Sequence, residues 1–242
     1  MIKFFRHIRQ NLLSKGKTAR YFKYAIGEII LVVIGILIAL QINTWNESRQ
    51  NNIKERNIIS EIHQEFLKNK EQLAFIKSRH QYHLQQIGKV VDLFPINVTT
   101  TNLDSLSHYM LESLANWTFE PTQGRIQWLV NSTNFDLIKN EGLRDALLLW
   151  EPTFEDYHED EQYSIAFNKE ELYPYLNKHF SRQLDLNDER MDLGVLETME
   201  FENMMYSRRG DLRAILHNDT NELQRLEQLI ETIIALTDTN TN

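Results

Sequence analysis

The hydrophobic positions of this chain form one continuous apolar run, followed by stripes of apolar residues at helical spacing. The run reads YAIGEIILVVIGILIALQINTWNE, and Glu28 is the one charged residue within its apolar part. At about 1.5 Å per residue, a helix from Tyr21 to Trp45 measures roughly 37 Å, enough to cross a hydrocarbon core of about 30 Å. The run therefore predicts a membrane-spanning helix over residues 21–46.

The residues flanking this run favour a membrane over the alternative, a buried core helix of a soluble protein. Tyr21, Lys23 and Tyr24 stand at its start and Trp45 at its end, and such side chains are typical of the membrane–water interface. Seven lysines and arginines precede the run and no small-residue cleavage pattern follows it. We therefore expect an uncleaved anchor in the inner membrane, with a cytoplasmic N-terminus and residues 47–242 in the periplasm.

Charge is unevenly distributed along the chain. The net charge is -8, but the residues before Glu28 carry +7, so residues 24–242 carry -15. We interpret residues 1–20 as a basic amphipathic segment lying on anionic membrane lipid; the alternative is a frayed basic tail that only sets the orientation. The acidic remainder argues against nucleic acid as a partner, because nucleic-acid binding relies on basic surfaces.

Glu28 lies about one helical turn inside the predicted hydrocarbon region, where an ionised carboxylate costs a few kcal/mol unless it finds a partner or binds a proton. Three interpretations are open: the side chain reaches the headgroup zone, it hydrogen-bonds a neighbouring helix, or it belongs to a proton path. Gly27, Gly35 and Ala39 form a strip of small residues that lets helices approach closely. We expect Glu28 and this strip to mediate association of membrane helices.

A stripe of apolar residues at three- and four-residue spacing follows the run, without a proline before Pro95. Asn69 and His80 occupy polar positions within this stripe. The pattern predicts a long helix over residues 47–94 that packs in a bundle or coiled coil, with the two polar residues fixing its register. The apolar stripe consists of Ile59, Ile62, Phe66, Leu73, Ile76, Leu84, Ile87, Val91 and Phe94.

A complementary stripe predicts a second long helix over residues 204–237, packed antiparallel to the first. Residues 95–203 then form a distal part made of shorter helices. We expect Asp104 to cap one of these helices and Pro152 to end another. No strand pair with a hairpin turn stands out, so the predicted fold class is all-α.

Candidate chemistry is sparse. His80 and His83 have the i and i+3 spacing of metal ligands, but no Asp or Glu lies near them in sequence, which favours an ordinary core or surface role. The acidic run around Tyr157 is interpreted as a solvated helix face; the alternative is a surface that gathers a divalent cation or a basic partner. The residues of this candidate interaction surface are Glu155, Asp156, His158 and Glu159.

Motifs that would support catalysis were not found. The sequence has no nucleophile elbow, phosphate-binding loop, dinucleotide fingerprint or metalloprotease helix. It also has no cysteine, which excludes disulfides, thiolate metal sites and cysteine nucleophiles. We therefore predict that the protein is not an enzyme and carries no cofactor.

The first 47 residues closely resemble the N-terminus of a membrane-protein family from Bacteroidota, domain-of-unknown-function family 6090. The shared features are the basic start, the Y-A-I-G-E-I motif, the V-V-I-G-I-L-I-A-L-Q-I-N core and the W-N-E exit. The segment NSTNFDLIKNEGLRDALLLW is similar to this family as well. The resemblance implies an inner-membrane protein with a helical periplasmic region, and it implies no activity.

These patterns together predict a structural or protein-interaction module of an envelope complex, which contacts a second copy of itself or another envelope protein. One alternative is a ligand-sensing periplasmic bundle that signals through its membrane helix to a separate partner; it requires a pocket in the distal part. Another is a periplasmic enzyme, for which a buried cluster of polar residues around Tyr157 and His158 would be the sign.

Overall fold

The computed structural model describes residues 18–238, except the side chains of residues 18–21 and 24, and this part of the chain contains helices and no strand. The all-α fold class is therefore confirmed. The chain divides into two compact units, Met1–Asn57 and Ile58–Asn242. We call them the first unit and the helical domain. The boundary expected from the sequence lay at residues 46 and 47.

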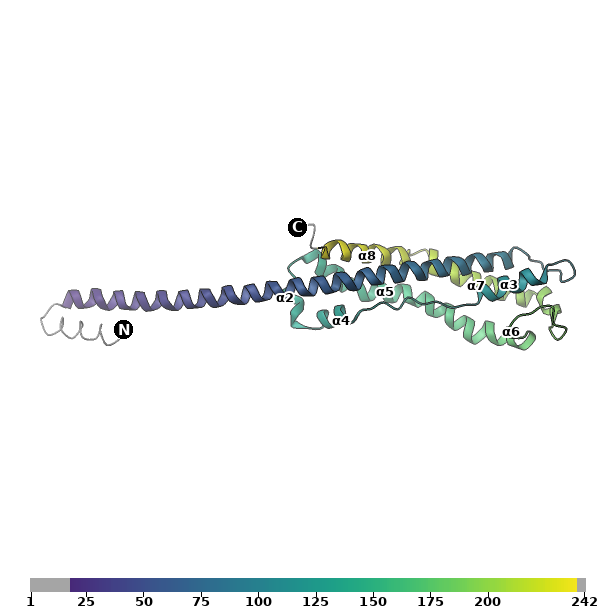
Figure 1. Cartoon of the computed structure of the whole chain (residues 1–242), viewed down its shortest axis with the longest axis horizontal. Helices are drawn as coiled ribbons and strands as arrows, with labels where there is room; N and C mark the ends of the chain where they lie inside the picture. Colours follow the sequence, from purple (N-terminus) through teal and green to yellow (C-terminus); the bar gives the residue numbers. More distant parts are fainter. Residues whose placement is uncertain (1–17, 239–242) are drawn as a thin grey trace. The chain divides into compact units, whose positions relative to one another are not determined.

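The first unit contains the start of the long helix α2 (Thr18–Val91), which ends in the helical domain (Figure 1). This helix carries the apolar run. A stretch of 18 residues has a mean hydropathy of 2.6, and none of it is buried. A helix that is apolar on every side has no amphipathic face to direct its packing. The apolar run of α2 has the length and composition to cross a membrane. Residues 1–17 of the predicted amphipathic segment lie outside the described residues.

The helical domain is built from the end of α2 and a series of shorter helices (Figure 1). Two of them, α5 and α6, follow one another through a single π-helical turn, η2 (Asn168–Leu172). Short 3-10 turns, η1 (Thr133–Leu137) and η3 (Leu193–Glu197), precede α5 and α7. The helices are α3 (Leu103–Ser113), α4 (Gly124–Val130), α5 (Glu141–Phe167), α6 (Tyr173–His179), α7 (Met199–His217) and α8 (Glu222–Thr237).

The C-terminal helix α8 packs antiparallel to the part of α2 that lies in the helical domain (Figure 1). The C-terminal stretch differs from the expected single helix over residues 204–237, because the chain turns between α7 and α8 at Asn221, which has a φ of 56°. Asparagine tolerates this left-handed conformation better than most residues. The pairs that fix the antiparallel register are His63–Thr237 at 3.0 Å, Lys70–Glu231 at 2.6 Å and Lys77–Glu227 at 2.7 Å.

Two predicted helix signals were wrong. Pro152 does not end a helix but lies inside α5. Its missing N–H would have bonded the carbonyl of Leu148, and both residues are exposed, so water can reach the carbonyl. The N-cap of α3 is Asn102, whose side chain accepts a hydrogen bond from the Ser105 backbone N–H at 2.9 Å, while Asp104 lies in the first turn.

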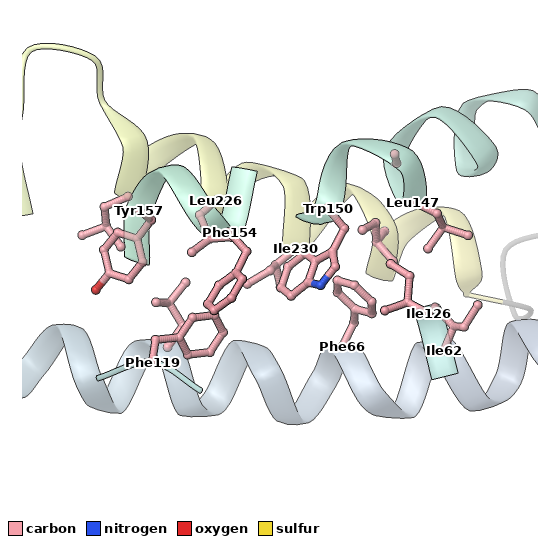
Figure 2. Packing of buried hydrophobic residues seen from close by; sticks show 14 of the residues in the cluster. Ile62, Phe66, Phe119, Ile126, Leu147, Trp150, Phe154, Tyr157, Leu226 and Ile230 are labelled. Carbon is pink, nitrogen blue, oxygen red and sulfur yellow. The ribbon is translucent and has the colours of Figure 1, made fainter. Parts of the chain in front are cut away.

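The domain has two apolar cores. The first core joins α2, α4, α5 and α8 around aromatic rings such as Phe66 and Trp150, whose centroids lie 4.7 Å apart in an edge-on arrangement (Figure 2). The second core joins the end of α2 with α3, α6 and α7, and contains Met110 and Met205. Leu84 of α2 packs against both cores. The layer between them holds polar side chains.

Candidate functional site: a buried polar belt

A layer of buried polar side chains separates the two cores, and we call it the polar belt. On α2, the buried apolar positions of the first core stop at Ile76 and those of the second core begin at Ile87. Burying polar groups is unfavourable unless they are hydrogen-bonded, so their partners define what the belt does. The belt residues, each at most 3% exposed, are His80, His83, Ser113, Glu161, Ser164, Asn168 and Arg208.

Glu161 is the acceptor at the centre of the belt. The hydroxyl of Tyr157 donates to its Oε1 at 2.9 Å, and the backbone N–H of Phe119 donates to its Oε2 at 2.9 Å. His80 Nε2 lies 3.1 Å from Oε1, and His158 Nδ1 lies 3.3 Å from Oε2. Because a carboxylate only accepts, each ring nitrogen carries the proton of its bond. Side chains from α2 and α5 thereby meet the extended backbone around Phe119.

Tyr157 is held in its neutral form by this environment. Burial raises the pKa of the Tyr157 hydroxyl, and the neighbouring negative charge of Glu161 raises it further. On α5, Tyr157, Glu161 and Ser164 recur at three- and four-residue spacing, so one face of the helix carries all three into the belt. The hydroxyl therefore remains a donor to Glu161 at physiological pH.

Arg208 is a fully buried cation of α7 that binds the C-terminal end of α3. Its Nε donates to the carbonyl of Ser113 at 3.0 Å, its Nη2 to the carbonyl of Ala115 at 2.9 Å, and its Nη1 to Ser164 Oγ at 2.6 Å. Burial lowers the pKa of Arg208 to about 10, which leaves it charged at neutral pH. A cation is favourable at this end of a helix, where the carbonyl groups concentrate negative partial charge.

Other elements bond the neighbouring carbonyl groups at the same end of α3. His83 Nδ1 donates to the carbonyl of Glu112. The hydroxyl of Tyr173 donates to the carbonyl of Leu114 at 2.8 Å, and Asn168 Nδ2 approaches the same oxygen at 3.4 Å. The last carbonyls of α3 would otherwise lack partners, since a helix leaves its final four unpaired. The belt therefore ties α2, α6, η2 and α7 to one helix end.

Two titratable groups near Arg208 are incompletely paired. His83 Nε2 and Asp211 Oδ2 are buried atoms without a hydrogen-bond partner among the described residues. Burial lowers the pKa of His83, which favours the neutral ring. Burial raises the pKa of Asp211 to about 6, although the charge of Arg208 acts in the opposite direction. Asp211 therefore takes up a proton under mildly acidic conditions.

Two further polar side chains of α2 hold the backbone that leads into α4. Asn69 Nδ2 donates to the carbonyl of Thr122 at 2.8 Å, and the Thr122 N–H donates to Asn69 Oδ1 at 2.9 Å. Glu65 Oε2 accepts from the Arg125 N–H at 3.3 Å. Burial raises the pKa of Glu65, while the backbone N–H groups that it binds lower it. These contacts hold residues 115–123, which we call the extended segment, against α2.

The chemistry of the belt is the pairing of backbone groups and the joining of helices. Protein donors surround the carboxylate of Glu161 on both oxygens. Among residues 18–238, no group of three or more His, Asp or Glu is placed to hold a metal ion. The candidate metal pair His80 and His83 is directed to separate partners, Glu161 and the carbonyl of Glu112. Buried networks in which most polar groups are paired favour one packing arrangement.

The structure separates the members of the candidate acidic interaction surface. Glu155, Asp156 and Glu159 are exposed, and Asp156 pairs with Arg225 of α8 at 3.3 Å. His158 instead turns toward Glu161 in the belt. The predicted register residues Asn69 and His80 are both buried and both bind partners outside their own helix. Their effect on register stays a prediction.

The candidate membrane residues all lie on α2. Glu28 is partly exposed, and a Cβ atom placed on Gly27 or Gly35 would meet nothing within 4 Å. The side chains of Tyr21 and Tyr24 lie outside the described residues. The roles of all these candidate residues in membrane association and at the membrane interface stay predictions. The exposed members are Lys23, Gly27, Gly35, Ala39 and Trp45.

Sequence reasoning missed Glu161 and Arg208, although the signal was present in the apolar pattern. In α7, Arg208 occupies a position in the stripe formed by Phe201, Met205 and Leu212, at spacings of three and four residues. Glu161 occupies the equivalent kind of position in α5. A charged residue inside an apolar stripe marks a buried polar group, by the same reasoning that identified Asn69 and His80.

Fold and site together define a helical domain with an internal polar layer, preceded by a strongly apolar helix. The chain belongs to a family of unknown function (DUF6090), whose model matches residues 28–205. This match includes most of the apolar run and extends through α3, α5 and α6. A search of curated proteins found no match, and a search of solved structures found none either.

Proposed function

We propose that this chain is a single-pass inner-membrane protein whose periplasmic helical domain acts as a structural or interaction module of an envelope complex. The observation that carries the proposal is the apolar run of α2, which has a mean hydropathy of 2.6 and no buried part. Contact between such a surface and water is unfavourable, whereas contact with lipid tails is favourable. A helix also satisfies its own backbone hydrogen bonds within the membrane. The basic residues before the run support a cytoplasmic N-terminus.

Exposed apolar side chains on α4 and α5 support an interaction role for the domain. Trp128 is 49% exposed, Leu148 52% and Leu149 56%, and the two helices contribute to the same apolar core. Leu148 and Leu149 are consecutive, and adjacent exposed apolar side chains are a feature of protein interfaces. The expected partner is a second copy of this chain or another envelope protein.

Alkaline carbonate extraction followed by intact-mass measurement tests the anchor. The full-length protein should remain in the membrane pellet, and its mass should include the N-terminal residues. Release into the supernatant would contradict a membrane-spanning helix. A mass that lacks the apolar run would identify a cleaved signal sequence instead.

The interaction role is tested by purifying the tagged protein from its native membrane after mild crosslinking and measuring the particle mass. We expect a particle heavier than one chain, and a lighter particle for the variant Leu148→Ser/Leu149→Ser. The control is Tyr163→Ser on the same helix, a residue that is 64% exposed. A monomer for the unaltered protein would contradict the proposal.

A groove in the distal part favours one alternative, a ligand-sensing domain. It has a volume of about 450 Å³ and lies between the end of α3 and the region of α6. This volume falls in the range of about 300–1,000 Å³ that is usual for small-molecule sites. A sensor of this kind would signal through α2 to a separate membrane partner.

A further inference from the structure

The groove between α3 and α6 has both apolar and polar residues in its lining. Leucines from three segments line it, together with Asn177, Ser181 and Arg182. Binding sites for small molecules commonly have this composition, because apolar walls provide affinity and a few polar groups fix orientation. The leucines are Leu111 and Leu114 at the end of α3, Leu176 of α6, and Leu184.

The charged residue of the groove lining is a cation, Arg182. Arg182 is exposed, and among residues 18–238 it makes no ion pair, so its guanidinium is available to a ligand. Asn177 and Ser181 add amide and hydroxyl donors to the same lining. A planar guanidinium matches a carboxylate through two parallel hydrogen bonds.

The wall formed by α3 would normally disfavour an anion, since Leu111, Leu114 and Ala115 lie at the negative end of that helix. The polar belt changes this. Arg208 binds the carbonyls of Ser113 and Ala115 from inside the domain, and its charge offsets the negative partial charge of the helix end. An anion in the groove would therefore meet the cation Arg182 and a helix terminus whose negative partial charge is offset by Arg208.

The far side of the groove is fixed before any ligand binds. The Leu184 N–H donates to the Ser181 carbonyl at 2.9 Å, which closes the turn that carries Arg182. Leu184 has a φ of 48°, a strained conformation for a branched side chain, and Ser107 holds it by donating to its carbonyl. A preformed site spends less binding free energy on ordering itself.

We propose that this groove binds a small carboxylic acid with an apolar body, whose carboxylate contacts Arg182 and whose body lies on the four leucines. The proposal deepens the ligand-sensing alternative by naming its ligand class. It does not depend on the membrane anchor or on the interaction role. A failure of ligand binding would therefore remove the sensor alternative and leave the main proposal intact.

Isothermal titration of the full-length protein in lipid nanodiscs with 4-phenylbutyrate tests the proposal, with 4-phenylbutanol as the uncharged comparison. We expect saturable binding of the acid, and binding of the alcohol that is weaker by about tenfold or more. Arg182→Gln should weaken binding of the acid by a similar factor and leave binding of the alcohol unchanged. Arg213→Gln, an exposed arginine outside the groove lining, is the matched control and should bind like the unaltered protein.

A second variant separates the groove from other surfaces. Leu111 is 40% exposed, so Leu111→Trp can fill the groove without disturbing a packed core. This variant should lose binding of both compounds while its thermal unfolding midpoint stays unchanged. Equal affinity of Arg182→Gln and the unaltered protein for the acid would overturn the proposal. So would an absence of saturable binding to the unaltered protein.

Discussion

Two consecutive arginines of α7 show how strongly position in an apolar stripe determines the role of a residue. Arg208 lies inside the domain and binds two carbonyls and a hydroxyl, whereas Arg209 lies over the ring of Tyr206, with 4.7 Å between the guanidinium carbon and the ring centroid. The two side chains have the same chemistry. Their free-energy contributions should differ because only Arg208 satisfies buried groups.

Replacing Arg208 by methionine tests this difference. The substitution keeps an unbranched side chain but removes the donor to the carbonyls of Ser113, which is buried, and of Ala115. We expect the free energy of unfolding of the full-length protein in detergent to fall by about 3 kcal/mol or more. The control Arg209→Met should change it by about 1 kcal/mol or less. Equal effects in urea titrations followed by circular dichroism would contradict a structural role for the belt.

Asp211 gives the belt region a pH dependence. Burial raises its pKa from the ordinary value of 3.8 to about 6, so its contribution to stability is greatest below pH 4 and is lost as the pH rises through about 6. Asp211→Asn should therefore be more stable than the unaltered protein at pH 7, by about 1 kcal/mol after allowance for solvent screening. The difference should disappear at pH 4. An advantage of the same size at both pH values would show that the carboxylate is not responsible.

At the scale of elements, α2 has polar residues at intervals along its buried face, and several of them bind another segment. Asn69 pairs with both backbone groups of Thr122, while His80 and His83 reach α5 and the end of α3. An apolar stripe alone leaves several registers nearly equivalent in energy. We expect these buried polar pairs to make the alternatives unfavourable, because a shifted register would leave them unpaired.

Asn69→Ala tests the contact between α2 and the extended segment. Two hydrogen bonds are lost and two backbone groups of Thr122 lose their partner. The free energy of unfolding should therefore fall by about 2 kcal/mol. Hydrogen exchange at the Thr122 amide should accelerate at the same time. The exposed neighbour Gln64→Ala is the control and should change neither quantity. Unchanged exchange at Thr122 in the Asn69 variant would contradict the proposed role.

The sequence predicted elements better than it predicted their ends and their polar contacts. Hydrophobic periodicity located α2 and α8 because an amphipathic helix repeats its pattern over many residues. Pro152 misled the prediction of α5, since a proline is tolerated when the carbonyl that it leaves unpaired faces solvent. Contacts such as Glu161 with Phe119 join residues 42 positions apart. Local pattern holds no information about such partners.

The whole molecule combines an apolar helix with a domain whose core is divided by polar residues. The domain buries many of its large apolar side chains in two cores, whereas those of the apolar run remain exposed. These opposite patterns are what our proposal requires, with water around the domain and lipid around the run. The central claim is that α2 spans a membrane and places the helical domain on its outer side.

Cysteine accessibility tests this claim most directly, because the chain contains no cysteine of its own. Single cysteines are introduced by Ser14→Cys before the apolar run and by Thr100→Cys at an exposed position after α2. The account predicts that a membrane-impermeant maleimide labels Thr100→Cys in intact spheroplasts and labels Ser14→Cys only after lysis. Labelling of Ser14→Cys but not Thr100→Cys in intact spheroplasts, or of neither before lysis, would contradict the account.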